Sequence, residues 1–173
     1  MRKVLISVAA AASALAFAAP AFSQTVPPPA KSVSLAGPRV GITMLSPGVI
    51  DALAERNIAV RPVITQFGWQ FEKQFFTTQG GLTAVTELVG LLGGLEQSLT
   101  IPSMSWMVGL RTSNGAEFGI GPNLTPAGAA LAIAAGVTIR SGVVNIPVNV
   151  AIVPSKAGVR LSVLTGFNLR GRR

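Results

Sequence analysis

The 173-residue sequence contains no cysteine and no histidine. Without cysteine the chain can form no disulfide, so its stability must come from secondary structure and packing. Histidine is the usual general base and a common metal ligand, and thiolate ligands are missing as well. These two absences argue against zinc or copper chemistry, and we expect no metal site.

Acidic residues are scarce too, with six Asp and Glu against fourteen Lys and Arg. A glycosidase needs two carboxyl groups at a defined separation, and the spacing of the acids selects no pair. No Gly-x-Ser-x-Gly motif is present. We therefore expect a protein that is not an enzyme, with no catalytic residue and no cofactor. The acids considered are Asp51, Glu72, Glu87, Glu96 and Glu117.

The sequence has one strongly apolar run, at its N-terminus. Arg2 and Lys3 precede the run Val4 to Ala19, and small residues follow up to Ser23. This order is typical of a secretory signal peptide, and the run is short and alanine-rich for a span that needs ~20 apolar residues. We predict a signal peptide over residues 1–23, a proline-rich linker over 24–37, and a single β domain over 38–173.

The charge of the chain favours acidic partners. The formal net charge is +8, and removal of Arg2 and Lys3 with the signal peptide leaves +6. Such a balance favours anionic lipid head groups. We do not expect nucleic acid as a partner, because the basic residues are scattered and the chain is exported. The one dense basic cluster, Arg170 to Arg173, is read as a solvated end.

Five runs between Met104 and Leu169 alternate apolar with small or polar side chains. Successive side chains of a strand point to opposite faces, so this period of two predicts strands. The first turn contains Asn114-Gly115, a pair typical of tight β-hairpins. We predict an all-β fold, an antiparallel up-and-down meander of about eight strands that forms a barrel or barrel-like sheet.

The residues before Met104 extend this pattern. Ser46-Pro47 is typical of a helix start, and Val49, Ile50 and Leu53 at helical spacing predict one short amphipathic helix that ends by Asn57. The Gly93-Gly94 pair sets the strand count: a kink there gives eight strands and a hairpin gives nine. The strand-like segments are Pro38 to Leu45, Ala59 to Thr77 and Leu82 to Ile101.

The two faces of the strands allow two environments. In a membrane barrel the apolar face would contact lipid, and several runs have the length that a tilted transmembrane strand requires. A soluble sheet that buries the same apolar face explains the alternation equally well. In the membrane alternative the polar face lines a small lumen, with Arg111, Glu117, Arg140, Asn145, Asn149, Arg160 and Asn168 as the candidate residues.

Particular residues argue against each environment. The chain has no tyrosine and only 6% aromatic residues, whereas membrane barrels carry aromatic girdles. Pro147 lies within a run, where it removes a ladder donor and predicts an edge or bulged strand, and a closed barrel has no edge. Against a soluble sheet, the second face consists mostly of Gly, Ala, Ser and Asn.

Aromatic residues concentrate in two segments. Phe67, Trp69, Phe71 and Phe75 share one face of a strand, and Trp106 lies in a later one. They could form a membrane-interface belt, a surface that binds an apolar ligand, or packed core.

Four segments together resemble an uncharacterised family of short exported bacterial envelope β-proteins. They are Gln66 to Phe75, Ser103 to Arg111, Glu117 to Asn123 and the ending from Val153 to Asn168. The resemblance covers most of the mature chain and implies a location in the bacterial outer membrane or periplasm, without an activity or a site. We expect a small outer-membrane-type β-barrel with a structural or binding role. The alternative is a soluble periplasmic barrel or sandwich that binds a lipid or other apolar ligand.

Overall fold

The computed structural model describes residues 36–141 and 144–169. The predicted signal peptide, residues 24–35 of the predicted linker and the basic tail from Arg170 to Arg173 lie outside the described residues. The helices are α1 (Pro47–Ala54) and the 3-10 helix η1 (Leu95–Gln97). The strands are β1 (Gly37–Leu45), β2 (Val63–Thr77), β3 (Thr83–Gly93), β4 (Ile101–Arg111), β5 (Ala116–Thr125), β6 (Gly128–Ser141), β7 (Val144–Ser155), β8 (Gly158–Gly166) and β9 (Asn168–Leu169).

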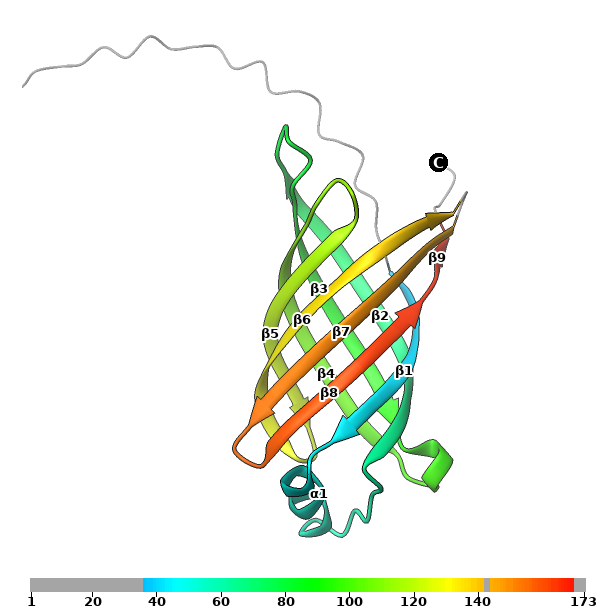
Figure 1. The fold of residues 1–173 in the computed structure, drawn as a ribbon, viewed down its shortest axis with the longest axis vertical. Coiled ribbons are helices and arrows are strands. Elements are labelled where there is room, and N and C mark those ends of the chain that lie inside the picture. Colours follow the sequence, from blue (N-terminus) through cyan, green and yellow to red (C-terminus); the bar gives the residue numbers. More distant parts are fainter. Residues whose placement is uncertain (1–35, 142–143, 170–173) are drawn as a thin grey trace, which may run out of the picture.

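Eight antiparallel strands close into a barrel (Figure 1). Strands β1 to β8 pair in sequence order and β1 also pairs with β8, which completes the ring. β9 adds a short pairing with β7. The predicted all-β meander is therefore confirmed as a barrel, and the sandwich alternative is excluded because the sheet closes on itself. None of the helices in the described part of the chain has the length and hydrophobicity that a transmembrane helix requires.

The period of two sorts side chains between the interior and the outer surface. Along β2, Gln66, Gln70 and Glu72 are buried, whereas Phe67 and Trp69 between them are exposed. The same alternation holds along β1 and β4. In a closed eight-stranded barrel the interior is just wide enough for side chains to fill it. Here the aromatic residues and most of the other large apolar residues face outward. The interior holds polar, charged and small residues with fewer large apolar ones, such as Leu91 and Met107.

Helix α1 covers one end of the barrel (Figure 1). Val49 and Leu53 are buried against Leu45 of β1 and Ile64 of β2, and these four residues form an apolar cluster. Ser46 stands at the predicted N-cap position, but its hydroxyl does not bond to the helix. It accepts a hydrogen bond from the Val159 backbone N–H of β8 at 2.9 Å, which ties the start of α1 to the barrel wall.

The helix is shorter than predicted, because its last turn unwinds before Asn57. The Asn57 amide bonds back to Ala54 O, and Asn57 has a positive φ of 62°. Asparagine tolerates this left-handed conformation better than most residues, so it is a natural place to end a helix. The strand that follows begins at Val63, four residues after the predicted start at Ala59.

The Gly93-Gly94 pair ends β3 and begins a turn, so of the two alternatives left open for this pair the kink is excluded. Gly94 has a φ of 82°, which favours glycine, and η1 follows directly. Residues 95–100 then form no strand, and β4 begins at Ile101. The barrel therefore has eight strands although Gly93-Gly94 is a turn, because the stretch that would have been the extra strand is a 3-10 helix.

Pro147 does not lie on an edge strand, so that expectation is wrong. β7 lies between β6 and β8, and Pro147 is paired with Thr138 of β6. On the other side of β7, β8 ends at Gly166 and β9 begins only at Asn168. Pro147 lies opposite this interruption, where a missing backbone donor breaks no regular ladder. The barrel thus accommodates the proline and still closes.

Candidate functional site

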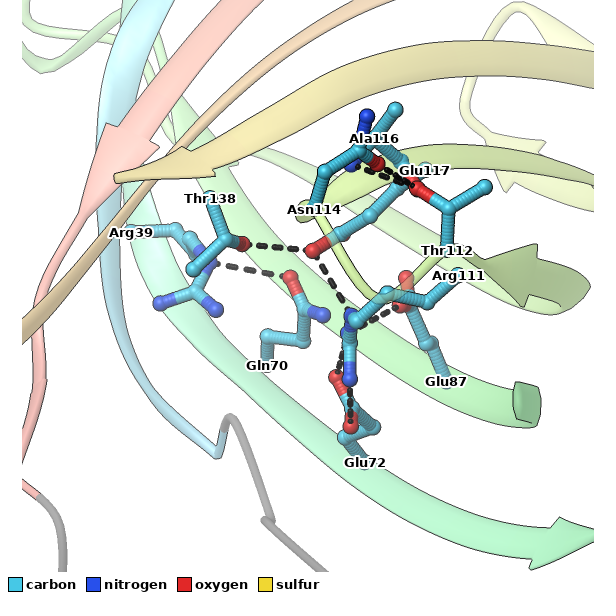
Figure 2. A network of polar contacts seen from close by, with 10 residues as sticks. All are labelled: Arg39, Gln70, Glu72, Glu87, Arg111, Thr112, Asn114, Ala116, Glu117 and Thr138. Carbon is cyan, nitrogen blue, oxygen red and sulfur yellow. Dashed lines mark hydrogen bonds and ion pairs between the residues drawn. The ribbon is translucent and has the colours of Figure 1, made fainter. Parts of the chain in front are cut away.

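A cluster of charged side chains occupies the barrel interior (Figure 2). Glu72 and Arg111 belong to the C-terminal halves of β2 and β4, the halves that lie away from α1 in Figure 1. Arg111 donates from Nη1 to Glu72 Oε1 at 2.7 Å and from Nη2 to Glu72 Oε2, a bidentate pair. Its Nε donates to Glu117 Oε1 at 2.7 Å. Glu87 Oε1 lies 3.7 Å from Arg111 Nη2. One guanidinium therefore holds three carboxylates, which come from β2, β3 and β5.

The strand register explains why these groups meet. Glu72 of β2 is paired directly with Glu87 of β3, and Arg111 of β4 is paired with Glu117 of β5. Two like charges on directly opposite residues repel each other. The planar guanidinium, whose donors match carboxylate geometry, compensates that repulsion. Removing the arginine alone would leave several buried carboxylates without a counter-charge.

The network continues around the lumen from this cluster. Thr138 of β6 donates to Glu117 Oε1 at 2.5 Å. Arg39 of β1 donates from Nε to Gln70 Oε1 at 2.9 Å and from Nη1 to Asn168 Oδ1 at 3.1 Å. Figure 2 shows Arg39 and Gln70 beside the charged cluster. Side chains from six of the barrel strands and from β9 are thus bonded across the lumen at this level.

The other half of the lumen, next to α1, contains a cavity. The volume open to the centres of water molecules is about 90 Å³. A volume of this size has room for several waters, since one needs roughly 10–15 Å³ by this measure. Apolar residues line it at the α1 end, among them Val49, Leu53 and Ile101. The rest of the lining mixes apolar residues such as Met107 and Val153 with polar ones, including Gln66, Ser103, Asn123, Arg160 and Ser162.

Two small hydrogen-bonded groups line this cavity. Thr43 bonds to Gln66 at 2.5 Å and to Ser162 at 2.6 Å. Asn123 Nδ2 donates to Ser103 Oγ at 3.0 Å and to Ser105 Oγ at 2.8 Å. These short side chains leave the space that the longer charged residues fill at the opposite end.

The outer surface of the barrel is apolar. All eight aromatic side chains in the described part of the chain are exposed, from 46% for Phe67 to 62% for Trp106. Packed core is therefore excluded for the aromatic residues singled out in the sequence. Among the described strand side chains, Lys73 is the one charged residue that faces outward, and it lies between Phe71 and Phe75 near the end of β2.

The structure places most of the predicted lumen residues inside the barrel. Arg111, Asn145, Arg160 and Asn168 are buried, and Glu117 takes part in the Arg111 cluster. Asn149 lines the cavity. Arg140 belongs to β6, but its side chain lies outside what the structure describes. The aromatic candidates Phe67, Trp69, Phe71, Phe75 and Trp106 all lie on the outer face.

Three charged lumen residues were not predicted from the sequence: Arg39, Glu72 and Glu87. Each stands next to a large apolar residue that faces outward, so the period of two could have predicted that these three side chains face the lumen. Glu72, for example, follows Phe71 directly and is buried where Phe71 is exposed. Glu87 precedes Leu88 in the same way. The spacing along the chain could not show that they would share one arginine.

Among residues 36–141 and 144–169, no group of His, Cys, Asp and Glu side chains is arranged to hold a metal ion. Comparisons with protein-family models, with curated proteins and with solved structures return no match for this chain. The function has to be argued from the barrel itself.

Proposed function

We propose that the chain is a small membrane-spanning β-barrel of the bacterial outer membrane, with a structural or binding role. The observation that carries this proposal is the distribution of side chains. Every described aromatic residue points outward, whereas Arg39, Glu72, Arg111 and Arg160 are buried inside the barrel. A water-soluble barrel has the reverse arrangement, and membrane barrels place apolar residues on the lipid side.

The outward side chains are large enough that their removal from water would stabilise the barrel strongly. Removing a Val, Leu, Ile or Phe side chain from water is worth roughly 1.5–3 kcal/mol. The outer wall carries such residues on all eight barrel strands, including Val40, Phe67, Leu88, Ile120 and Val150. In water this surface would stay hydrated or aggregate, and in a bilayer it is solvated by acyl chains. The lumen groups need no lipid contact because they bond mainly to one another.

The connections between strands support one orientation in the membrane. The first barrel strand, β1, begins at the end of the barrel opposite α1, and the last one, β8, ends there (Figure 1). The connections at the α1 end are residues 46–62, 94–100, 126–127 and 156–157, so two of the four are long. At the other end the described connections are the shorter segments 78–82 and 112–115. Outer-membrane barrels have short periplasmic turns and longer extracellular loops. We therefore propose that α1 faces the cell exterior and the chain termini face the periplasm.

The side chains inside the barrel close the lumen, so we do not propose an open pore. The Arg111 cluster and the Arg39 bonds cross the lumen at one level, and α1 covers the end nearest the cavity. A continuous aqueous channel would require both to move. The soluble alternative is less well supported, because it would leave the aromatic residues and most of the other large apolar side chains of the outer wall exposed to water.

The two tryptophans allow a direct test in lipid. Trp69 and Trp106 are the only tryptophans of the chain, and both face outward from β2 and β4. We expect the protein, refolded into vesicles that contain bromine-labelled acyl chains, to lose most of its tryptophan fluorescence. Vesicles with unlabelled lipid are the control. Fluorescence that is equal in the two vesicle types would contradict insertion.

Fractionation of expressing cells gives a second test. An integral barrel stays with the membrane pellet after carbonate or urea extraction. Release of the folded protein into the soluble fraction would favour the soluble alternative over the membrane barrel.

A further inference from the structure

Among the described lumen side chains, Arg160 is an arginine without an ion pair to any acid. Arg160 of β8 is 7% exposed, and its side chain makes one hydrogen bond to the described residues, from Nη1 to Thr125 Oγ1 at 2.7 Å. Its Nε has no protein acceptor. All six acids of the sequence are among the described residues, and none of them forms an ion pair with Arg160. A buried guanidinium without a counter-charge is destabilising, and an anion bound beside it would compensate the charge.

The surroundings of Arg160 form a site and not merely a packing defect. Arg160 lines the cavity of about 90 Å³ beneath α1. Asn123, on the inward face of β5 two residues before Thr125, lines the same cavity and has an amide Oδ1 without a protein donor. Both residues thus line one cavity, and the guanidinium of Arg160 is the positively charged group there that has no ion pair among the described residues.

We propose that this cavity binds a small organic monocarboxylate, whose carboxylate accepts hydrogen bonds from Arg160. A guanidinium presents parallel donors that match a carboxylate. The wall at the α1 end, with Val49, Leu53 and Ile101, suits a short hydrocarbon body. The proposal concerns the lumen and holds in detergent as well as in a bilayer.

The charge of the lumen favours a monovalent ligand over phosphate. The described lumen side chains carry three positive groups, Arg39, Arg111 and Arg160, and three carboxylates, Glu72, Glu87 and Glu117. A monovalent anion would be matched by the single positive charge of Arg160. A divalent anion would bring a second negative charge that none of the described side chains compensates, into a cavity that Glu87 also lines.

The test is isothermal titration of the refolded full-length mature chain in detergent with acetate, propionate and butyrate. Butan-1-ol is the uncharged analogue of butyrate, and inorganic phosphate is the competing anion. We expect saturable binding of the carboxylates and at least about tenfold weaker binding of butanol and of phosphate, because charge-assisted hydrogen bonds are the strong ones. Absence of saturable carboxylate binding, or equal binding of butanol or phosphate, would overturn the proposal and leave a cavity that holds water only.

Variants locate the site. Arg160→Met keeps similar volume without charge and should weaken butyrate binding about tenfold or more, whereas Lys156→Met, in the exposed β7–β8 turn, should leave it unchanged. Ala151→Leu fills the cavity and keeps Arg160, so it should also abolish binding, even if Arg160→Met fails to refold. Unchanged affinity in a folded Arg160→Met or Ala151→Leu protein would overturn the assignment.

Discussion

At the scale of single residues, Arg111 contributes most to holding the polar lumen together. It is bonded to Glu72 and Glu117 and lies near Glu87, so three negative charges depend on one positive charge. A buried pair adds little net stability over apolar packing, but removal of one partner is costly because the other stays buried and charged.

We expect Arg111→Met to lower the free energy of unfolding by about 3–5 kcal/mol. Adding Glu72→Gln to that variant should restore part of the loss, because one buried charge fewer remains uncompensated. Urea titration of the refolded protein, followed by tryptophan fluorescence, measures both. Lys156→Met is the control for loss of an exposed positive charge. A midpoint for Arg111→Met equal to that of the control would show that the lumen carboxylates do not need Arg111.

Two glycines on neighbouring strands test how closely the barrel wall is packed. A Cβ added to Gly68 of β2 would lie 2.0 Å from Gly90 O, a backbone atom that cannot rotate away. A Cβ added to Gly90 of β3 has no atom within 4 Å. The two positions therefore differ in space although both are strand glycines.

We expect Gly68→Ala to destabilise the barrel by about 1–3 kcal/mol, the usual cost of overpacking. Gly90→Ala should change stability by less than about 0.5 kcal/mol, as for most surface substitutions. Thermal or urea unfolding of the two variants side by side is the measurement. Equal effects would mean that β2 and β3 can separate without cost at Gly68.

At the scale of elements, η1 is fastened to β2 by side chains and not by apolar packing. Glu96 accepts hydrogen bonds from the Thr65 backbone N–H at 3.1 Å and from the Thr65 hydroxyl. Gln97 donates to Val63 O at 2.8 Å and to Glu96 Oε1 at 2.9 Å. These hydrogen bonds, with that from Thr65 foremost, lower the pKa of Glu96 to about 2.

The lowered pKa makes the attachment of η1 dependent on pH. A carboxyl group whose pKa is depressed in the folded state stabilises that state above its ordinary pKa, and this contribution disappears as pH falls towards the folded value. We expect the η1 connection to stay attached at pH 5 and to loosen between about pH 4 and pH 2. Amide hydrogen exchange at Thr65 reports it. Glu96→Gln should remove the pH dependence, and an unchanged profile in that variant would contradict the assignment.

At the scale of the whole molecule, the outward apolar face decides where the barrel is stable. Val150 lies in the middle of β7 and Val159 near the start of β8, and both are exposed. In a bilayer these positions differ in depth, whereas in water they are equivalent.

We expect Val150→Arg to destabilise the inserted barrel by about 2–4 kcal/mol, and Val159→Arg by about 0–1 kcal/mol. Urea titration of each variant in lipid vesicles measures the difference. Equal effects of the two arginines, or better solubility without loss of stability for Val150→Arg, would favour a barrel that stays in water.

Several features were predictable from local chemistry. The alternation along the later strands, the Asn-Gly turn after β4 and the start of α1 at Pro47 all appear where the residues indicate. The end of α1 and the choice between a kink and a turn at Gly93-Gly94 were not, because they depend on Asn57 and Gly94 adopting positive φ in a particular tertiary setting. Glu72 and Arg111 are 39 residues apart, and only the strand register brings them together.

Local sequence is enough to say which side chains share a face, because successive Cβ atoms of a strand point to opposite sides whatever the strand packs against. It also excluded disulfides, by composition. Only the tertiary structure decided which face is inside. Closing the ring through β1 and β8 turned the apolar face outward and gathered the charged face in the lumen. Which face lies inside depends on the curvature of the sheet and on pairing between distant strands. The alternation of side chains within one strand specifies neither.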